Sequence, residues 1–172
     1  MRLALCLVLF ACSAALGFLF ADRLTQRCRA LRTVQGMLSA LFMRLKYYQE
    51  PLYQAAAHTA PHLETEANDW LTALAHRLEN GSSAGQALEC ILSQTKPPLA
   101  LNQALGAEEK AALVELFERI GSHREDQEAA FALCAERLEQ LLSAAEETRL
   151  RRGKLYRTVG VLGGAVWVIL FL

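Results

Sequence analysis

The chain has 172 residues, a length that fits a single domain, and its 18 basic and 18 acidic side chains cancel at neutral pH. A net charge of zero gives no indication of the kind of partner that the protein binds. Five cysteines at scattered positions exclude a disulfide framework and are typical of small buried side chains in a reducing compartment. The distribution of charge along the chain is more informative than these totals.

The N-terminal segment is uncharged from Leu3 to Ala21. These 19 residues would span about 28 Å as a helix, at about 1.5 Å per residue, which is enough to cross the hydrocarbon core of a bilayer. A cleaved signal peptide or a lipoprotein leader are the alternatives, but the apolar run continues through Gly17–Phe20, past either cleavage site. We therefore predict an uncleaved transmembrane anchor over residues 1–21.

Residues 22–157 show the period of amphipathic helices and no strand-like alternation. Breaks at Pro51, Pro61, Asn80-Gly81, Lys96-Pro97-Pro98 and Gly121 divide this segment into six predicted helices. Short connections between neighbouring helices favour reversal, so we predict an all-α, antiparallel six-helix bundle between two transmembrane helices. The first and last helices continue into the anchors, and we expect them to pair.

Two capping boxes, Ser83–Gln86 and Ser122–Glu125, predict the starts of the fourth and sixth helices. A loop through Asn102 is predicted before the fifth helix, which covers about residues 107–120. The predicted core comprises Leu24, Leu31, Val34, Leu38, Leu41, Leu45, Tyr48, Leu63, Ala67, Trp70, Leu71, Leu74, Leu78, Ala87, Leu88, Ile91, Leu92, Leu113, Leu116, Phe117, Ile120, Phe131, Cys134, Leu138, Leu141 and Ala145.

A second uncharged stretch runs from Thr158 to Leu172. It is short for a span, and we predict that residues 158–172 form a transmembrane or membrane-inserted segment. Gly160 and Gly164 lie one helical turn apart, a spacing that allows close helix packing in lipid. Glycine is also common in membrane helices without such a role, and the two interpretations are equally favoured.

Basic side chains border the central segment on both sides. They are Arg23, Arg27, Arg29 and Arg32 after the first anchor, and Arg149, Arg151, Arg152, Lys154 and Arg157 before the second. Positive residues near membrane spans stay on the cytoplasmic side. We therefore expect a multi-pass protein of the cell membrane whose large domain, residues 22–157, is cytoplasmic and whose rims contact the lipid bilayer.

The sign of the charge reverses between these rims. Residues 33–148 hold 17 acidic and 8 basic side chains, a net charge of −9, which disfavours nucleic acid and suits a basic face on a partner protein. Glu115, Glu118, Glu125 and Glu128 form two pairs along helix faces and are the candidate partner-docking residues. A solvated helix surface explains individual carboxylates equally well.

No catalytic, cofactor-binding or metal-ligating residues are predicted. His58 and His62 have helical spacing, but Pro61 separates them and no third ligand is in register. The chain lacks a glycine-rich phosphate loop and a nucleophile elbow. An enzyme is therefore not expected, and no cofactor is expected.

The order of these features resembles the stage III sporulation protein AB family of endospore-forming bacteria. Besides the anchors and the basic rims, the resemblance lies in Glu50-Pro51-Leu52, Gly81–Leu88, Ile120-Gly121-Ser122-His123-Arg124-Glu125-Asp126-Gln127 and Gly160-Val161-Leu162-Gly163-Gly164. It covers essentially the whole chain.

The resemblance implies a non-enzymatic inner-membrane platform subunit of the secretion channel that joins mother cell to forespore, with its domain on the mother-cell side. It implies a cytoplasmic domain similar to the type II secretion system F domain. The implied partners are the stage III sporulation AA ATPase and other subunits of the channel. Whether the chain also forms a homo-oligomer is left open by the resemblance.

Two alternatives to this role are a platform of another type II secretion or pilus-like machine and a membrane signalling sensor. A sensor would normally have its large domain outside the cell, whereas the arginine residues beside both anchors predict a cytoplasmic domain. The placement of arginine therefore argues against a sensor. A membrane-bound enzyme would need a convergent polar site, which the sequence does not provide.

Overall fold

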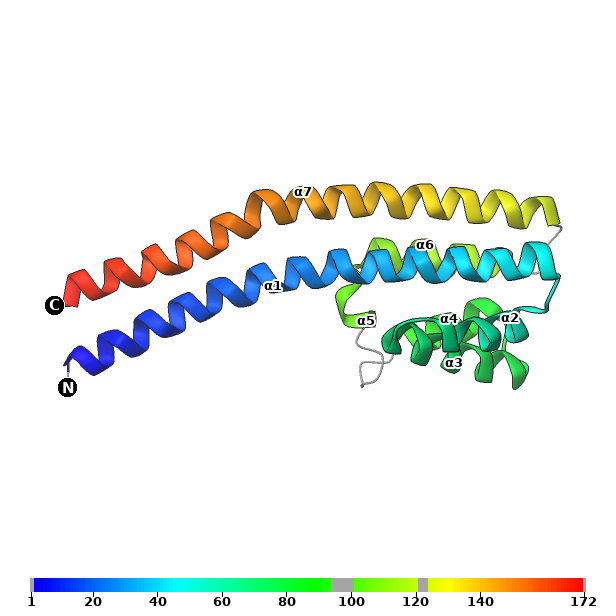
Figure 1. The fold of residues 1–172 in the computed structure, drawn as a ribbon, viewed down its shortest axis with the longest axis horizontal. Coiled ribbons are helices and arrows are strands. Elements are labelled where there is room, and N and C mark those ends of the chain that lie inside the picture. Colours follow the sequence, from blue (N-terminus) through cyan, green and yellow to red (C-terminus); the bar gives the residue numbers. More distant parts are fainter. Residues whose placement is uncertain (1, 94–100, 121–123, 172) are drawn as a thin grey trace. The chain divides into compact units, whose positions relative to one another are not determined.

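The structure, a computed structural model, describes the backbone of residues 2–93, 101–120 and 124–171. Side chains 2–10, 13–14, 124–125, 156–157, 160–161 and 163–171 are outside the described set. The secondary structure of the described backbone consists of helices joined by short turns, with no strand (Figure 1), so the predicted all-α class is confirmed.

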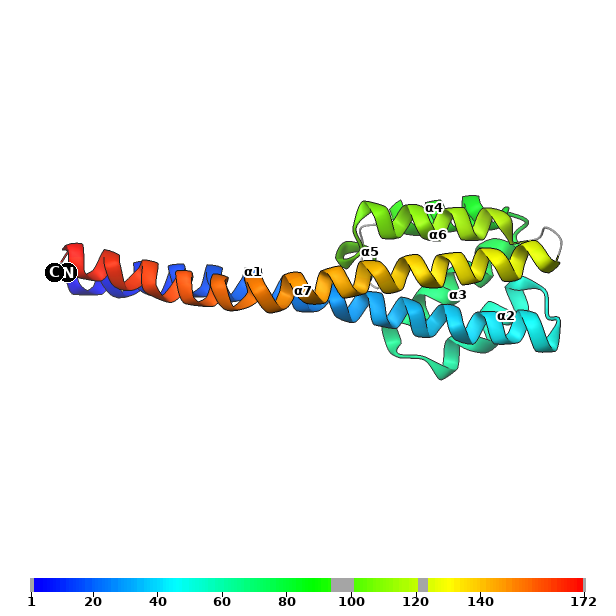
Figure 2. The same ribbon diagram turned by 90° about the horizontal axis from the view of Figure 1, so that it is seen from above.

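The chain divides into two compact units. Unit 1 comprises Met1–Cys28 and Ser143–Leu172, and unit 2 comprises Arg29–Leu142. Helix α1, Arg2–Met43, and helix α7, Arg124–Phe171, each contribute residues to both units. Within unit 1 the two helical segments run side by side, with both chain ends at the same end of the unit (Figures 1 and 2), as expected for the predicted pairing of the first and last helices.

Among the described residues, no helix combines the length and the apolar character that a membrane span requires. The transmembrane helices predicted over residues 1–21 and 158–172 are therefore not confirmed. Most side chains of both segments, including the Gly160 and Gly164 positions, lie outside the described set.

Unit 2 adds the shorter helices, which are α2, Leu52–Thr59; α3, Thr65–Glu79; α4, Ala84–Ser93; α5, Leu101–Ala104; and α6, Ala107–Arg119. Helix α2 packs on α3, α3 on α4, and α4 on α6. Most of the predicted core is buried, including Leu31, Val34, Leu41, Trp70, Leu71, Leu74, Leu88, Ile91, Leu113, Leu116, Phe117 and Leu138.

The apolar stripe predicted for the first helix does not stay buried up to the end of that helix. Leu45 is only partly buried, and Tyr48 is 71% exposed. The reason is a π-helical turn, η1, over Arg44–Tyr48. Its wider turn advances each side chain by a smaller angle than an α-helix does, so a core pattern extrapolated at 3.6 residues per turn no longer points inward.

The loop predicted through Asn102 is wrong, because helix α5 lies there. Asn102 is buried, donates its amide to the carbonyl of Ile91, and accepts a hydrogen bond from Trp70 Nε1 at 3.2 Å. Leu101 and Leu105 are buried beside it. These tertiary contacts hold one short turn of helix that local sequence preference does not predict.

The predicted boundary between α3 and α4 is confirmed at both ends. Gly81 has a φ of 86°, and its backbone N–H donates a hydrogen bond to the carbonyl of Leu78 at 3.0 Å. The backbone N–H of Ser82 donates a second hydrogen bond to the carbonyl of Arg77 at 3.2 Å. This is a Schellman motif, which requires a left-handed residue. Helix α4 begins where Ser83 Oγ accepts from the Gln86 amide at 3.4 Å. Gly121, Ser122 and His123 lie outside the described backbone, and the side chains of Arg124 and Glu125 are outside the described set, so the second predicted capping box stays a prediction.

Candidate docking surface

Glu115, the first of the predicted docking residues, bridges two helices of unit 2. Its carboxylate accepts a hydrogen bond from Arg119 Nη2 at 2.9 Å, one turn along α6, and lies 3.7 Å from Arg137 Nη1 on α7. The side chain is 45% exposed, so each ion pair contributes little to stability. A basic partner would nevertheless have to compete with two guanidinium groups for this carboxylate.

Glu128 is also paired within unit 2. Its Oε2 lies 3.0 Å from Nζ of Lys46, and the same ammonium lies 5.5 Å from the centre of the Phe42 ring. The pair connects α7 with the π-helical turn. The side chain of Glu125 lies outside the described set.

Glu118 differs from these two residues, because it is exposed and forms no ion pair among the described residues. It lies beside α4, where a Cβ added at Gly85 would meet its Cγ at 2.8 Å. Glu115 therefore faces α7 and Glu118 faces α4. Glu115, Glu118 and Glu128, the predicted docking residues whose side chains are described, therefore face different neighbours.

A group of large exposed side chains, close together in the sequence from the end of α1 to the start of α2, was missed by sequence reasoning. It consists of Met43, Tyr47, Tyr48 and Tyr53, which are 53%, 67%, 71% and 39% exposed, and we call it the tyrosine patch. Tyrosine is enriched in protein interfaces, where a rigid ring contributes contact area and a hydroxyl. The signal was available: three of the chain's four tyrosines lie within residues 47–53, around a proline break.

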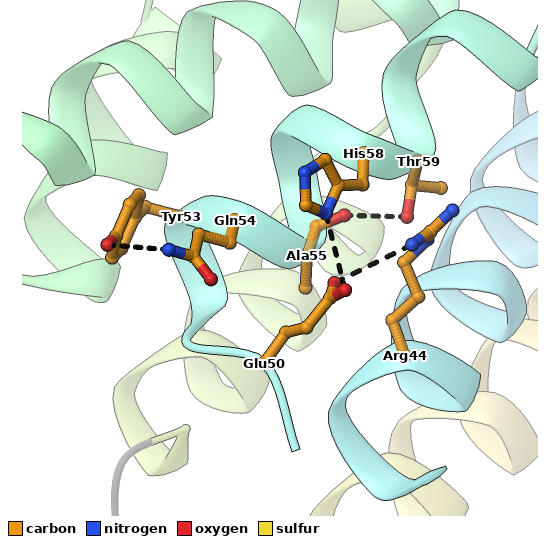
Figure 3. Close-up of polar contacts among 7 residues, drawn as sticks. All are labelled: Arg44, Glu50, Tyr53, Gln54, Ala55, His58 and Thr59. Atoms are coloured by element: carbon orange, nitrogen blue, oxygen red, sulfur yellow. Dashed lines mark hydrogen bonds and ion pairs between the residues drawn. The ribbon is translucent and has the colours of Figure 1, made fainter. Parts of the chain in front are cut away.

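A polar network fixes the backbone beside this patch (Figure 3). The Glu50 carboxylate is 19% exposed and lies 3.6 Å from Arg44 Nη1 and 3.3 Å from His58 Nδ1. Gln54 Nε2 donates to the Tyr53 hydroxyl at 3.0 Å. Because Glu50 follows a residue with a φ of 54°, its contacts attach the reversed chain to α2.

Cys134 provides a measurable probe of the α6–α7 contact. Its Sγ lies 3.7 Å from the carbonyl oxygen of Ala112, and the side chain is buried. Burial raises the pKa of this thiol from 9.0 to about 11; the charge of Glu115 adds to the rise and that of Arg137 opposes it.

We expect Cys134 to resist alkylation at pH 8 far more than the exposed Cys90. A pKa two units higher leaves about 100-fold less thiolate, and burial limits access further. Iodoacetamide labelling resolved by peptide mass spectrometry measures both rates. In urea the two rates should converge. Equal rates in the folded protein would contradict the described burial of Cys134.

The sign of the pH dependence follows from the same shift. Because folding favours the protonated thiol, this group's contribution to stability is lost as the pH rises from about 9 to about 11. A Cys134→Ser variant, which lacks the titrating thiol, should lose less stability over that range.

Fold and surface together describe an all-helical protein with exposed tyrosine and carboxylate side chains on unit 2. In a comparison with known proteins, the model of the stage III sporulation protein AB family matches residues 2–172 of this chain. The chain is 27% identical over 158 residues to stage III sporulation protein AB of Bacillus subtilis (strain 168), covering 91% of this chain and 90% of that protein. The chain belongs to the stage III sporulation protein AB family. No solved structure matches it, so the expected similarity to type II secretion F domains stays a prediction.

Proposed function

We propose that this protein is a non-enzymatic platform subunit of the secretion channel between mother cell and forespore, where it docks a cytoplasmic secretion ATPase. The observation that carries the proposal is the match to a sporulation family along residues 2–172. The ATPase expected from this role is the stage III sporulation AA protein. A platform of another type II secretion or pilus-like machine could use the same unit 2, but membership of a sporulation family favours the channel.

Membrane anchoring is the second part of the proposal. The uncharged stretches within residues 1–21 and 158–172 support two anchors, and the arginine-rich rims support a cytoplasmic position for the residues between them. Gly160 and Gly164 would allow the anchors to pack closely. The side-by-side course of the two segments within unit 1 is compatible with such a pair.

Docking would combine charge and exposed aromatic area. The net charge of −9 over residues 33–148 would steer a basic face of the ATPase toward unit 2. The tyrosine patch supplies exposed rings able to become desolvated anchors in an interface. Of the carboxylates proposed earlier, Glu118 is the informative one to test, because reversing Glu115 or Glu128 would also break contacts within unit 2.

Co-purification of the protein with the stage III sporulation AA ATPase of the same organism tests the docking proposal. We expect salt-sensitive binding that falls about tenfold or more in a Tyr47→Ser, Tyr48→Ser double variant and by a smaller factor in Glu118→Lys. Leu133→Ser is the matched control, since Leu133 is 53% exposed but lies outside the tyrosine patch. Absence of binding at low salt, or binding that both sets of variants leave unchanged, would contradict the proposed docking.

A further inference from the structure

A groove lies along the surface of unit 2 between α1 and α7, with a volume of about 480 Å³. Its floor is apolar and consists of Leu38 and Phe42 of α1 with Phe131 and Leu138 of α7. The Phe42 and Phe131 rings lie 4.8 Å apart between centres and close the floor at one end. Leu38, Phe131 and Leu138 are nearly inaccessible to solvent, so the groove is a shallow channel over a packed core.

The walls of the groove carry small side chains at helical spacing. The residues of α7 that line the groove lie at positions 128, 131, 132, 135, 138, 139 and 142, and among them Glu128, Ala132, Ala135, Glu139 and Leu142 are spaced alternately four and three residues apart. This heptad-like stripe runs beside Phe131 and Leu138, the buried residues of the same helix that also line the groove. Ala132 and Ala135 are exposed, and Ser39 of α1 is exposed opposite them. Small residues in such positions allow a third helix to approach two paired helices closely.

The charge of the groove restricts what could occupy it. Its lining includes the carboxylates of Glu128 and Glu139, and none of the described residues that line it is basic. Lys46 pairs with Glu128 at one end, whereas Glu139 is exposed further along. An occupant with an apolar face and flanking lysine or arginine residues complements both the floor and the rim.

We propose that this groove is the docking site for an amphipathic helix of another protein, with an apolar face flanked by basic side chains. The stripe from Glu128 to Leu142 spans 15 residues, about 21 Å along the helix axis, which sets the length of helix that fits. The groove does not include the tyrosine patch, so the proposal does not depend on ATPase docking.

Binding of a designed peptide to the full-length protein in zwitterionic nanodiscs tests the proposal. The probe is a fluorescein-labelled helix of about 18 residues, roughly 27 Å long, with leucine and alanine on one face and lysine on the flanks. A second peptide carries glutamate in place of lysine, and empty nanodiscs measure adsorption to lipid. We expect the lysine peptide to bind at least about tenfold more tightly than the glutamate peptide at low salt.

Two matched pairs of variants locate the binding. Ala135→Trp fills the groove and should weaken binding at least about tenfold, whereas Ala129→Trp, an exposed alanine of α7 outside the groove, should not. Glu139→Lys should weaken binding about three- to tenfold, and Glu136→Lys, outside the lining, should have less effect. Circular dichroism would verify that each variant is folded.

Three outcomes would overturn the proposal. The first is equal binding to Ala135→Trp and Ala129→Trp, and the second is equal binding of the two peptides. The third is a wild-type dimer that Ala135→Trp converts to a monomer without any peptide binding, which would assign the groove to a second copy of this chain.

Discussion

Replacing Trp70 with alanine is expected to lower the free energy of unfolding by about 3–5 kcal/mol. The indole is fully buried, lies edge-on to the Phe117 ring with centres 6.3 Å apart, and donates a hydrogen bond to Asn102. Truncation therefore removes a large apolar side chain, leaves a cavity in the core of unit 2, and leaves a buried acceptor without this donor. Urea denaturation of the purified protein, followed by circular dichroism, measures the loss.

Tyr48→Ala is the control for Trp70→Ala. Tyr48 is 71% exposed and is expected to change the free energy of unfolding by no more than about 0.5 kcal/mol. If Trp70→Ala lost less than about 1 kcal/mol, the side chain could not occupy the core position described for it.

Asn102→Ala is expected to lower the free energy of unfolding by about 2–4 kcal/mol. The substitution takes one hydrogen-bond partner from the buried Trp70 Nε1 and one from the buried Ile91 carbonyl, each of which costs about 1–3 kcal/mol when left unpaired. It also releases α5, which this side chain ties to α3 and α4. Thermal or urea unfolding measures the total effect.

A double-mutant cycle isolates the hydrogen bond between Trp70 and Asn102. Trp70→Phe removes only the indole donor, so its coupling with Asn102→Ala reports the Trp70–Asn102 bond, expected at about 1 kcal/mol. Asn68→Ala is a matched control, because its bond to Thr72 is exposed and should cost no more than about 0.5 kcal/mol. Zero coupling would contradict the bond between Trp70 and Asn102.

Periodicity was sufficient to predict most of the helices. The 3.6-residue pattern identified the buried faces of α3, α4 and α6, and the motif at Gly81 identified a helix end, because local backbone chemistry determines both. Helix α5 escaped prediction because its stability comes from Asn102, whose partners are 11 and 32 residues away in sequence. The π-helical turn escaped because an α-helical pattern was extended to Tyr48.

The candidate docking residues were less predictable than the fold. Sequence spacing places Glu115 and Glu118 on one helix, but it does not reveal that Glu115 meets Arg137 of α7 while Glu118 lies beside Gly85 of α4. Ion pairs between helices depend on how the helices pack, which periodicity does not specify. The tyrosine patch depends on the reversal at Gln49, which the pattern of apolar residues does not encode.

The proposed docking surface and the proposed helix-binding groove lie on different parts of unit 2. The tyrosine patch is formed by the end of α1, η1 and the start of α2, whereas the groove is formed by α1 and α7. Glu128 and Phe42 both line the groove and both lie against Lys46 of η1, so they connect the two regions. A variant of Tyr47 should therefore weaken binding of the ATPase, and a variant of Ala135 should weaken binding of the amphipathic helix.

Deleting the gene in its host and counting heat-resistant spores tests the proposed platform role most directly. We predict that forespores are engulfed but that late forespore gene expression and heat-resistant spores are almost lost. The full-length gene should restore both, and the Tyr47→Ser, Tyr48→Ser variant, produced at normal levels, should not. Heat-resistant spores at the wild-type frequency in the deletion strain would contradict the proposed function.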